Sequence, residues 1–432
     1  MIERLRTRIQ ATATVERYRK SVGDFTRRRR LTFGRVVVLI LRGHKLSLQT
    51  GLSKFFHGLG DVLQTPTASA YSQARRKIAP EVFRELTRQM CADVYELCGA
   101  DKEIRLWQGH RLLGADGTMF NLPDSAELRK AFTEQGNQHK TYPQALGVVL
   151  YDLLNDIGLD GEMGPLQHEK NMLFGLWGQT RAGDVVVLDR LFADYSVIAV
   201  ASSTGRHVVI RCGRKRAQQI DDFWNSKATE RIIHLRLSQH RETRIYVTTQ
   251  NLPTSVRVRL IKFELPSGET EVLLTTLCDK KIYPTAVFYE VYGARWKQET
   301  YYKRVKSIFE LERFSGLTEQ TIRQDFHGVI LLATLESILT RDAQEELASD
   351  VPETPLKTTA AVNRAESYAI LLDRIVHLLL NKNVSLQRLM EEMHHLFLLH
   401  PIRHAPHRSA PRRPPTSSAQ LKFHMYRKRL TC

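Results

Sequence analysis

The stretch GDVVVLDRLF, Gly183–Phe192, decides the fold that the sequence predicts. Its centre is a run of branched apolar residues that ends at Asp189, and such a run favours a buried β-strand. A helical segment at about 192–203 and a second apolar run, His207–Cys212, follow directly. Strands that alternate with helices are typical of a sheet with helices on its faces.

The residues before this stretch predict further strands of the same sheet. Arg111–Phe120 (RLLGADGTMF) is apolar up to Asp116, and we expect a turn at Gly117. Residues 145–166 predict two strands joined at Asn155 and Asp156, with a helix from about 168 to 177. A hairpin followed by alternating strands and helices predicts the α/β class, with a mixed sheet flanked by helices.

Residues 213–283 interrupt the alternation and predict a β-rich insertion before a long late helix. Four short runs in this segment have the composition and spacing of antiparallel strands. They are RIIHLRLS (Arg231–Ser238), RIYVTT (Arg244–Thr249), SVRVRLIKFEL (Ser255–Leu265) and EVLLTTL (Glu271–Leu277).

The two ends of the chain predict helices. We expect an N-terminal helical domain at 1–100, a domain built on the mixed sheet at 101–345 and C-terminal helices with a basic tail at 346–432. Ser47 is placed to cap one N-terminal helix, and Thr65 with Pro66 to begin another. This second helix would leave Ser69, Ser72, Gln73 and Arg76 exposed for a DNA groove, as in helix-turn-helix proteins. A plain helical bundle gives the same pattern, so both readings stay open.

Charge is concentrated at the ends of the chain. Residues 1–50 contain thirteen Lys and Arg against three acidic residues, residues 401–432 contain eight against none, and the whole chain carries +18. Basic arms on a neutral body favour binding to a polyanion such as nucleic acid, with solubilising tails as the alternative. No apolar run is long enough for a membrane span and no signal peptide is recognisable, so we expect a cytoplasmic protein.

The stretch YGARWKQETYYKRVK, Tyr292–Lys306, places one carboxylate among several cations. On a helix with about 100° per residue, Tyr292, Arg295, Glu299 and Lys306 fall within about 60° of one another. Apolar residues between 287 and 309 occupy the opposite side, so the helix would pack through this apolar face and present an ordered polar stripe. A solvated charged face is the alternative.

Three carboxylates are candidates for one site. Asp116 and Asp189 follow buried strands, and Glu299 lies on the polar stripe. Each aspartate alone is more often a turn former. Carboxylates that converge in a crevice repel one another unless divalent cations lie among them, and oxygen ligands suit Mg²⁺ or Mn²⁺.

These residues carry a resemblance to a known family. The chain resembles the DDE transposases of the bacterial insertion-sequence-4 class, whose catalytic domain is similar to ribonuclease H. The family signature is Tyr, two residues, Arg, three residues, Glu, six residues, Lys, and Tyr292, Arg295, Glu299 and Lys306 stand at those spacings. ADGTMFNLPD and VVVLDRLFADY also resemble the regions of the family's two aspartates, and the likeness covers roughly residues 20–345.

The resemblance implies a metal-dependent transposase that binds double-stranded DNA, both the inverted repeats at the element ends and the target. It implies two Mg²⁺ or Mn²⁺ ions held by Asp116, Asp189 and Glu299, which catalyse strand cleavage and transfer. It also implies a homodimer in the synaptic complex and a place at the bacterial nucleoid. A catalytically silent DNA-binding regulator and a general nuclease on the same fold are the alternatives.

Further residues are candidates for contact with DNA. Tyr292, Arg295 and Lys306 would hold phosphates beside the scissile one. Arg190, next to Asp189, would contact the backbone or form a structural ion pair. The remaining candidates are the basic cluster Arg211, Arg214, Lys215 and Arg216 and the helix residues Gln73 and Arg76.

Overall fold

The computed structural model describes residues 1–404, except 28, 44–46, 101–102, 138–139, 168, 215–216, 265–267, 350–358 and 382. The chain forms two compact units. The first unit comprises Met1–Leu97, Phe120–Ala145 and Lys303–Cys432, and the second comprises Cys98–Met119 and Leu146–Tyr302. The division into three domains that the sequence suggested stays a prediction. All three candidate carboxylates belong to the second unit.

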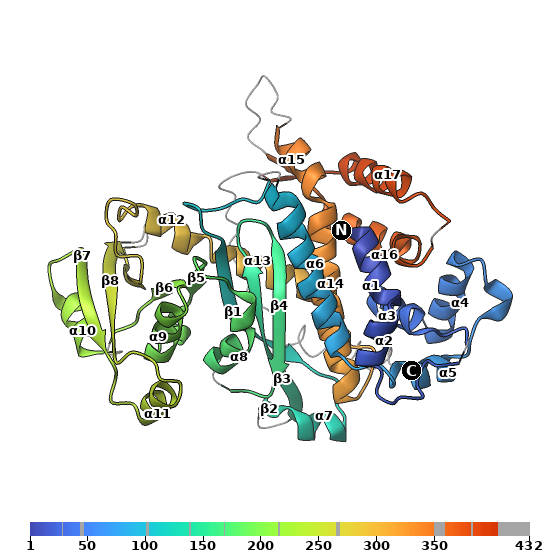
Figure 1. Ribbon diagram of the computed structural model, residues 1–432, viewed down its shortest axis with the longest axis horizontal. Coiled ribbons are helices and arrows are strands. Elements are labelled where there is room, and N and C mark those ends of the chain that lie inside the picture. The colour runs from blue at the N-terminus through green and yellow to red at the C-terminus, as the bar shows by residue number, and fades with distance from the viewer. Residues whose placement is uncertain are drawn as a thin grey trace. The chain divides into compact units, whose positions relative to one another are not determined.

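A mixed sheet organises the second unit (Figure 1). Its strand order is β4-β3-β1-β5-β6-β9-β8-β7. Strand β2 also pairs with β3, along a different part of β3 from the part that pairs with β4. The strands are β1 (Leu112–Asn121), β2 (Thr133–Asn137), β3 (Lys140–Asp152), β4 (Ile157–Gly164), β5 (Val185–Leu188), β6 (His207–Arg211), β7 (Glu230–Arg236), β8 (Ser255–Glu264) and β9 (Thr270–Thr275).

The central strands run parallel, and β5 among them is buried at every residue. Residues Val185–Leu188 of β5 pair with β1 on one side and with β6 on the other, and all four have 0% exposure. The β3–β4 pair is antiparallel, as are the pairs that β9 forms with β6 and β8. The α/β class with a mixed sheet flanked by helices is therefore confirmed.

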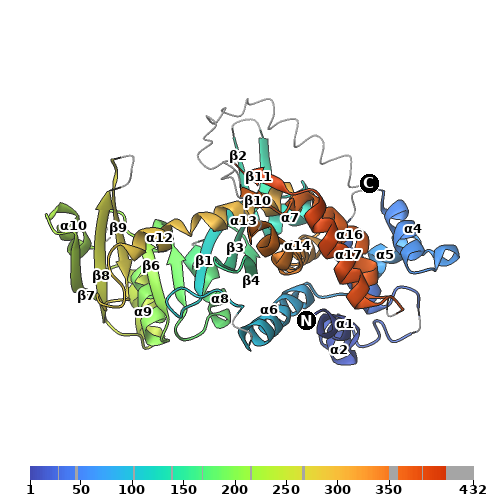
Figure 2. The same cartoon turned by 90° about the horizontal axis from the view of Figure 1, so that it is seen from above.

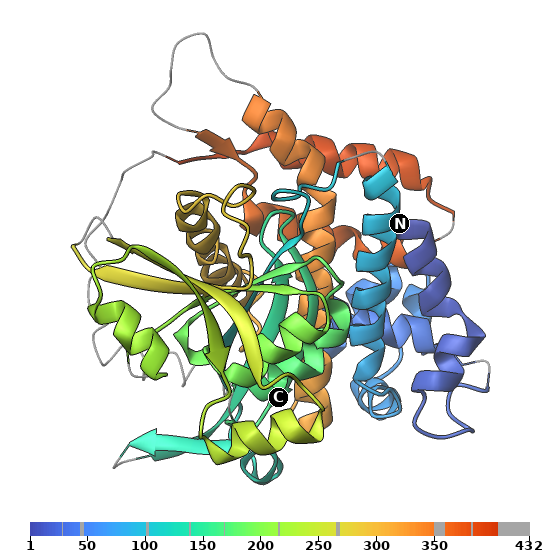
Figure 3. The ribbon, with the colours of Figure 1, turned by 60° about the vertical axis from the view of Figure 1, so that its left-hand side comes forward.

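Helices cover this sheet and connect its strands. α9 packs on β6 and β8, and α10 packs on β7 and β8. The strands of the insertion extend the sheet beyond β6, as the yellow-green and yellow ribbons of Figure 3 show. The helices of this unit are α8 (Glu169–Leu176), η2 (Trp177–Gln179), η3 (Arg190–Phe192), α9 (Tyr195–Ser203), α10 (Gln218–Asn225), α11 (Arg241–Thr249), α12 (Val287–Gly293) and α13 (Trp296–Ser307), which continues beyond the unit.

Three sequence-based expectations in this unit were wrong. RIYVTT forms part of helix α11 instead of a strand, because Thr243 and Val247, four residues apart, bury one helical face against α9 while Ile245 is exposed. No turn occurs at Gly117, since β1 continues to Asn121. The long late helix is interrupted at Ala294 and Arg295, so that α12 and α13 are separate.

The first unit is mainly helical, as predicted for residues 1–100. α3 is buried along eight of its ten residues and packs against α1, α14 and α16, while α16 and α17 lie side by side (Figure 2). Its other elements are α1 (Ile2–Gln10), α2 (Thr12–Tyr18), α3 (Phe33–Arg42), α4 (Leu48–Gly58), η1 (Val62–Gln64), α5 (Ala68–Arg75), α6 (Glu81–Ala100), α7 (Ala126–Ala131), α14 (Glu319–Leu339), α15 (Arg341–Ser349), β10 (Thr359–Ala361), α16 (Arg364–Leu379), α17 (Leu386–Leu399) and β11 (Ile402–His404).

The helix caps of this unit partly match the prediction. The Ser47 hydroxyl accepts a hydrogen bond from the Thr50 amide and caps α4, as expected. Thr67, and not Thr65, caps α5 by accepting from the Ala70 amide, so Pro66 lies before the helix. Within the described part of the chain, no helix combines the length and the apolar character that a bilayer crossing requires.

Candidate active site

Strand register brings two carboxylates together. β1 and β5 are parallel neighbours, and their paired residues run from Leu112 opposite Val185 to Ala115 opposite Leu188. The next residue on each strand is an aspartate, Asp116 on β1 and Asp189 at the end of β5. The pairing therefore places both carboxylates at the same edge of the sheet, beyond the carboxyl end of β5, where open α/β sheets commonly bind ligands.

The segment from α12 to α13 adds the third carboxylate and two donors. The Tyr292 hydroxyl donates to Asp189 Oδ1 at 3.4 Å. Arg295 donates from Nη1 to Asp116 Oδ2 at 3.5 Å and from Nη2 to Glu299 Oε1 at 3.0 Å. The guanidinium thus lies between Asp116 and Glu299, and the structure brings together five of the residues that the sequence selected.

Buried hydrogen bonds fix α13 against the sheet. The Tyr302 hydroxyl donates to the Asp116 carbonyl oxygen at 2.5 Å and accepts from the Val149 amide at 2.9 Å. Gln298, which is fully buried, donates from Nε2 to the Val149 carbonyl at 3.0 Å. A Cβ on Gly114 would lie 2.8 Å from Gln298 Oε1, so this close approach of helix and strand depends on glycine.

A fourth carboxylate, Glu169 at the start of α8, lies at the same edge of the sheet. A Cβ on Gly117 would lie 2.1 Å from Glu169 Oε1, so the carboxyl group rests against the strand directly after Asp116. The sequence analysis missed Glu169. The available signal was Gly117 itself, which was interpreted as a turn former although a glycine within a strand often marks close approach of another group.

The site is short of positive charge. Burial raises the pKa of Asp116 to about 6, although Arg295 and the Gly117 amide oppose the shift. Burial also raises the pKa of Glu169 to about 7, and the charges of Asp116 and Asp189 add to this shift. Burial also raises the pKa of Tyr292 to about 12, so its hydroxyl remains a proton donor.

The donor set fits a divalent cation of the Mg²⁺ type. Every candidate ligand is a carboxylate oxygen, and Glu169 Oε2 is buried without a hydrogen-bond partner among the residues that the structure describes. In the described ranges, no three His, Cys, Asp or Glu side chains are already arranged as a metal site. Arg295 occupies the space between two of the carboxylates, so a cation there would replace its contacts.

A family model described as the transposase DDE domain matches residues 107–335, which is more than half of the chain. The chain belongs to the transposase DDE-domain family. The matched span of this DDE domain contains β1, β5 and α13, and therefore Asp116, Asp189 and Glu299.

Two curated transposases resemble this DDE-domain chain. The transposase InsG for insertion sequence element IS4 of Escherichia coli (strain K12) is 23% identical over 273 residues, which cover 62% of this chain and 60% of that protein. The putative transposase InsZ of the same strain is 25% identical over 210 residues, covering 46% of this chain and 68% of its own length. The chain thus spans less than two thirds of InsG.

Among solved structures, a cryo-EM structure of a piggyBac transposase synaptic complex with hairpin DNA has a TM-score of 0.44 and 10% identity. The similarity covers 92% of this chain and 85% of that one.

Two of the weaker candidates contact residues other than the three carboxylates. Arg211 forms an ion pair with Glu271 at 2.8 Å, and the Arg214 guanidinium lies 5.2 Å from the centre of the Trp224 ring. Arg190 is exposed in η3 beside Asp189. Lys215 and Arg216 lie outside the described residues.

Three candidates belong to the first unit. Lys306 lies two turns after Glu299 on α13, with Nζ 4.9 Å from the centre of the Phe120 ring. Gln73 and Arg76 are exposed on or next to α5, where Gln73 Nε2 donates to Ser69 Oγ at 3.3 Å. A contact of these residues with DNA stays a prediction.

Proposed function

We propose that the chain is the transposase of an insertion sequence, which binds the terminal inverted repeats of its element and cleaves and joins DNA strands. The observation that carries this proposal is the meeting of Asp116, Asp189 and Glu299 around Arg295 and Tyr292. Strand register alone would explain two adjacent carboxylates, but not the third from a distant helix. We further propose that two protomers act together on the two ends, in the cytoplasm at the nucleoid.

Asp116, Asp189 and Glu299 are proposed to hold a pair of Mg²⁺ or Mn²⁺ ions. When bound, these ions would activate a water or a 3′-hydroxyl and stabilise the leaving oxygen of the scissile phosphate. The carboxylates supply the negative charge that retains them, and burial at the edge of the sheet strengthens that attraction.

Arg295, Tyr292 and Lys306 are proposed to position the DNA strand. Arg295 is 8% exposed and is held between carboxylates, so its donors become available for a phosphate once other positive charge neutralises Asp116 and Glu299. Tyr292 keeps its proton at neutral pH and can donate to a second phosphate oxygen. Arg190 and Arg214 are proposed to contact the backbone nearby.

The proposal is tested with a DNA duplex that carries an inverted repeat flanking the gene, incubated with Mg²⁺. Asp116→Asn, Asp189→Asn and Glu299→Gln are each expected to reduce the rate of strand cleavage by about a thousandfold, ~4 kcal/mol, while end binding persists. The control is Glu290→Gln, which removes an exposed carboxylate of α12 and should leave cleavage unchanged. Undiminished cleavage by any of the three variants would contradict the proposal.

A further inference from the structure

Glu169 lies where a ligand of the cation site would lie. It begins α8, and its carboxyl group rests against Gly117, since Cδ would be 2.4 Å and Oε1 2.1 Å from a Cβ at that position. Gly117 directly follows Asp116, whose carboxylate accepts a hydrogen bond from the Gly117 amide at 3.0 Å. The absent side chain at residue 117 is therefore what allows a fourth carboxyl group to reach the catalytic edge of the sheet.

The Glu169 carboxyl group lacks a counter-charge among the described residues. Oε2 is buried and has no hydrogen-bond partner. The adjacent cation, Lys170, pairs with a different carboxylate, because its Nζ donates to Asp194 Oδ2 at 2.8 Å. A buried carboxylate oxygen without a partner destabilises the fold, and more so when the group is charged, unless a ligand satisfies it.

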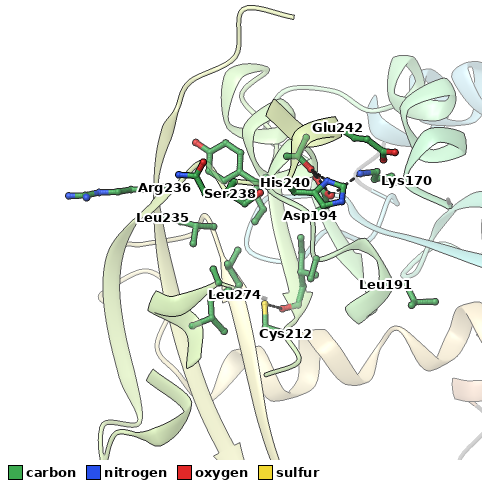
Figure 4. Close-up of a pocket in the computed structure, with 18 of the residues that line it drawn as sticks. Lys170, Leu191, Asp194, Cys212, Leu235, Arg236, Ser238, His240, Glu242 and Leu274 are labelled. Carbon is green, nitrogen blue, oxygen red and sulfur yellow. Dashed lines mark hydrogen bonds and ion pairs between the residues drawn. The ribbon is translucent and has the colours of Figure 1, made fainter. Parts of the chain in front are cut away.

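Glu169 also lies at the border of a pocket. With Lys170 it lines a pocket of about 850 Å³, whose other walls come from α9, α10, α11 and the strands of the insertion. Figure 4 shows Lys170 directed toward Asp194 within this pocket, together with His240. Lys170 therefore faces its own partner in the pocket and not the Glu169 carboxylate.

We propose that Glu169 is a fourth carboxylate ligand of the divalent-cation site, contributed by α8 beside Asp116 and Asp189. The inference rests on the proposed function, because it takes the two aspartates as ligands of the same ions. Mg²⁺ prefers six oxygen ligands, and a fourth carboxylate supplies one that Asp116, Asp189 and Glu299 do not. Glu169 would then contribute to cation affinity before any DNA is bound.

The experiment measures binding of Mn²⁺ to the DNA-free, full-length protein, using the EPR signal of free Mn²⁺. Glu169→Gln is expected to weaken the affinity about tenfold, because it keeps the shape of the side chain and removes the charge. Gly117→Ala should give a similar loss, since its methyl group displaces the Glu169 carboxyl group and leaves the carboxylate count unchanged. Glu290→Gln is the matched control and should bind as the wild type does. Thermal unfolding in chelator verifies that each variant is folded.

Asp116→Asn separates the two proposals. If Asp116→Asn weakens Mn²⁺ binding and Glu169→Gln does not, Glu169 is no ligand, whereas the proposed function stands. If both variants bind Mn²⁺ as tightly as the wild type, the cation site itself is wrongly placed. A tenfold loss in both Glu169→Gln and Gly117→Ala, with none in Glu290→Gln, supports the inference.

Discussion

The two ends of the β1–β5 strand pair have opposite electrostatics. Before the strands begin, Arg111 faces Asp184, with Nε donating to Oδ1 at 2.9 Å and Nη2 to Oδ2 at 2.5 Å. Where β5 ends, the same register places Asp116 beside Asp189, two like charges. The chain neutralises itself at the first end and leaves negative charge in excess at the second. One end thus stabilises the fold, and the other is suited to bind cations.

The largest effect on stability is expected where the charges are paired. The side chains of Arg111 and Asp184 are 8% and 4% exposed, so Asp184→Asn leaves a buried guanidinium without its partner and should lower the free energy of unfolding by about 3 kcal/mol. Asp189→Asn relieves repulsion and should not lower it. Urea unfolding in the presence of chelator measures both. Equal destabilisation by the two variants would contradict the electrostatic difference between the two ends of the strand pair.

The pH dependence of stability should reveal the excess of negative charge. The folded-state pKa values of Asp116 and Glu169, about 6 and about 7, lie above those of the unfolded chain. Raised pKa values mean that the folded state binds these protons more tightly than the unfolded state does. The stability that this binding contributes is complete below pH ~4 and is lost as the pH rises through 6 and 7.

Glu169→Gln should abolish the part of the stability loss at high pH that comes from Glu169. In chelator at pH 8 the variant should be more stable than the wild type by about 1 kcal/mol, a value reduced for screening by water because the side chain is only partly buried. At pH 4 the two proteins should be equal. A wild-type free energy of unfolding that does not change from pH 4 to 8 in chelator would show that folding does not raise the pKa values of Asp116 and Glu169.

The smallest effect concerns Lys306, whose Nζ lies over the ring of Phe120. Lys306→Ala should weaken binding to end DNA severalfold and reduce the slope of log affinity against log salt by about 1, as expected for one lost phosphate contact. Lys303→Ala, an exposed lysine on the same helix, is the matched control. An unchanged salt slope would show that Lys306 is not a phosphate ligand.

Strand and helix placement was predictable wherever burial and chain pattern agreed. The run VVVL favours a buried strand, and the end of β5 then fixed Asp189, whereas Asp116 lies within β1, which continues to Asn121. RIYVTT was mispredicted because an alternating run of six residues fits a strand, while contacts with α9 decide for a helix. Tertiary packing overrode local preference there.

The signature spacing predicted which residues of α12 and α13 meet, but not how. The i,i+4 contact of Arg295 with Glu299 follows from helical spacing, whereas the contact of Arg295 with Asp116 on β1 does not. Glu169 was missed for another reason. Its role depends on Gly117 from a different strand, and one sequence does not reveal which distant side chain fills the space beside a glycine.

The central claim is that Asp116 and Asp189 hold divalent cations during strand cleavage, and a change of ligand and metal tests it most directly. A thiolate binds Mg²⁺ poorly and Mn²⁺ better. Asp189→Cys should therefore be inactive on end DNA in Mg²⁺ and regain cleavage in Mn²⁺, whereas Asp189→Ala should stay inactive with both metals. Cleavage by Asp189→Cys at the wild-type rate in Mg²⁺, or an equal defect in both metals, would contradict the account.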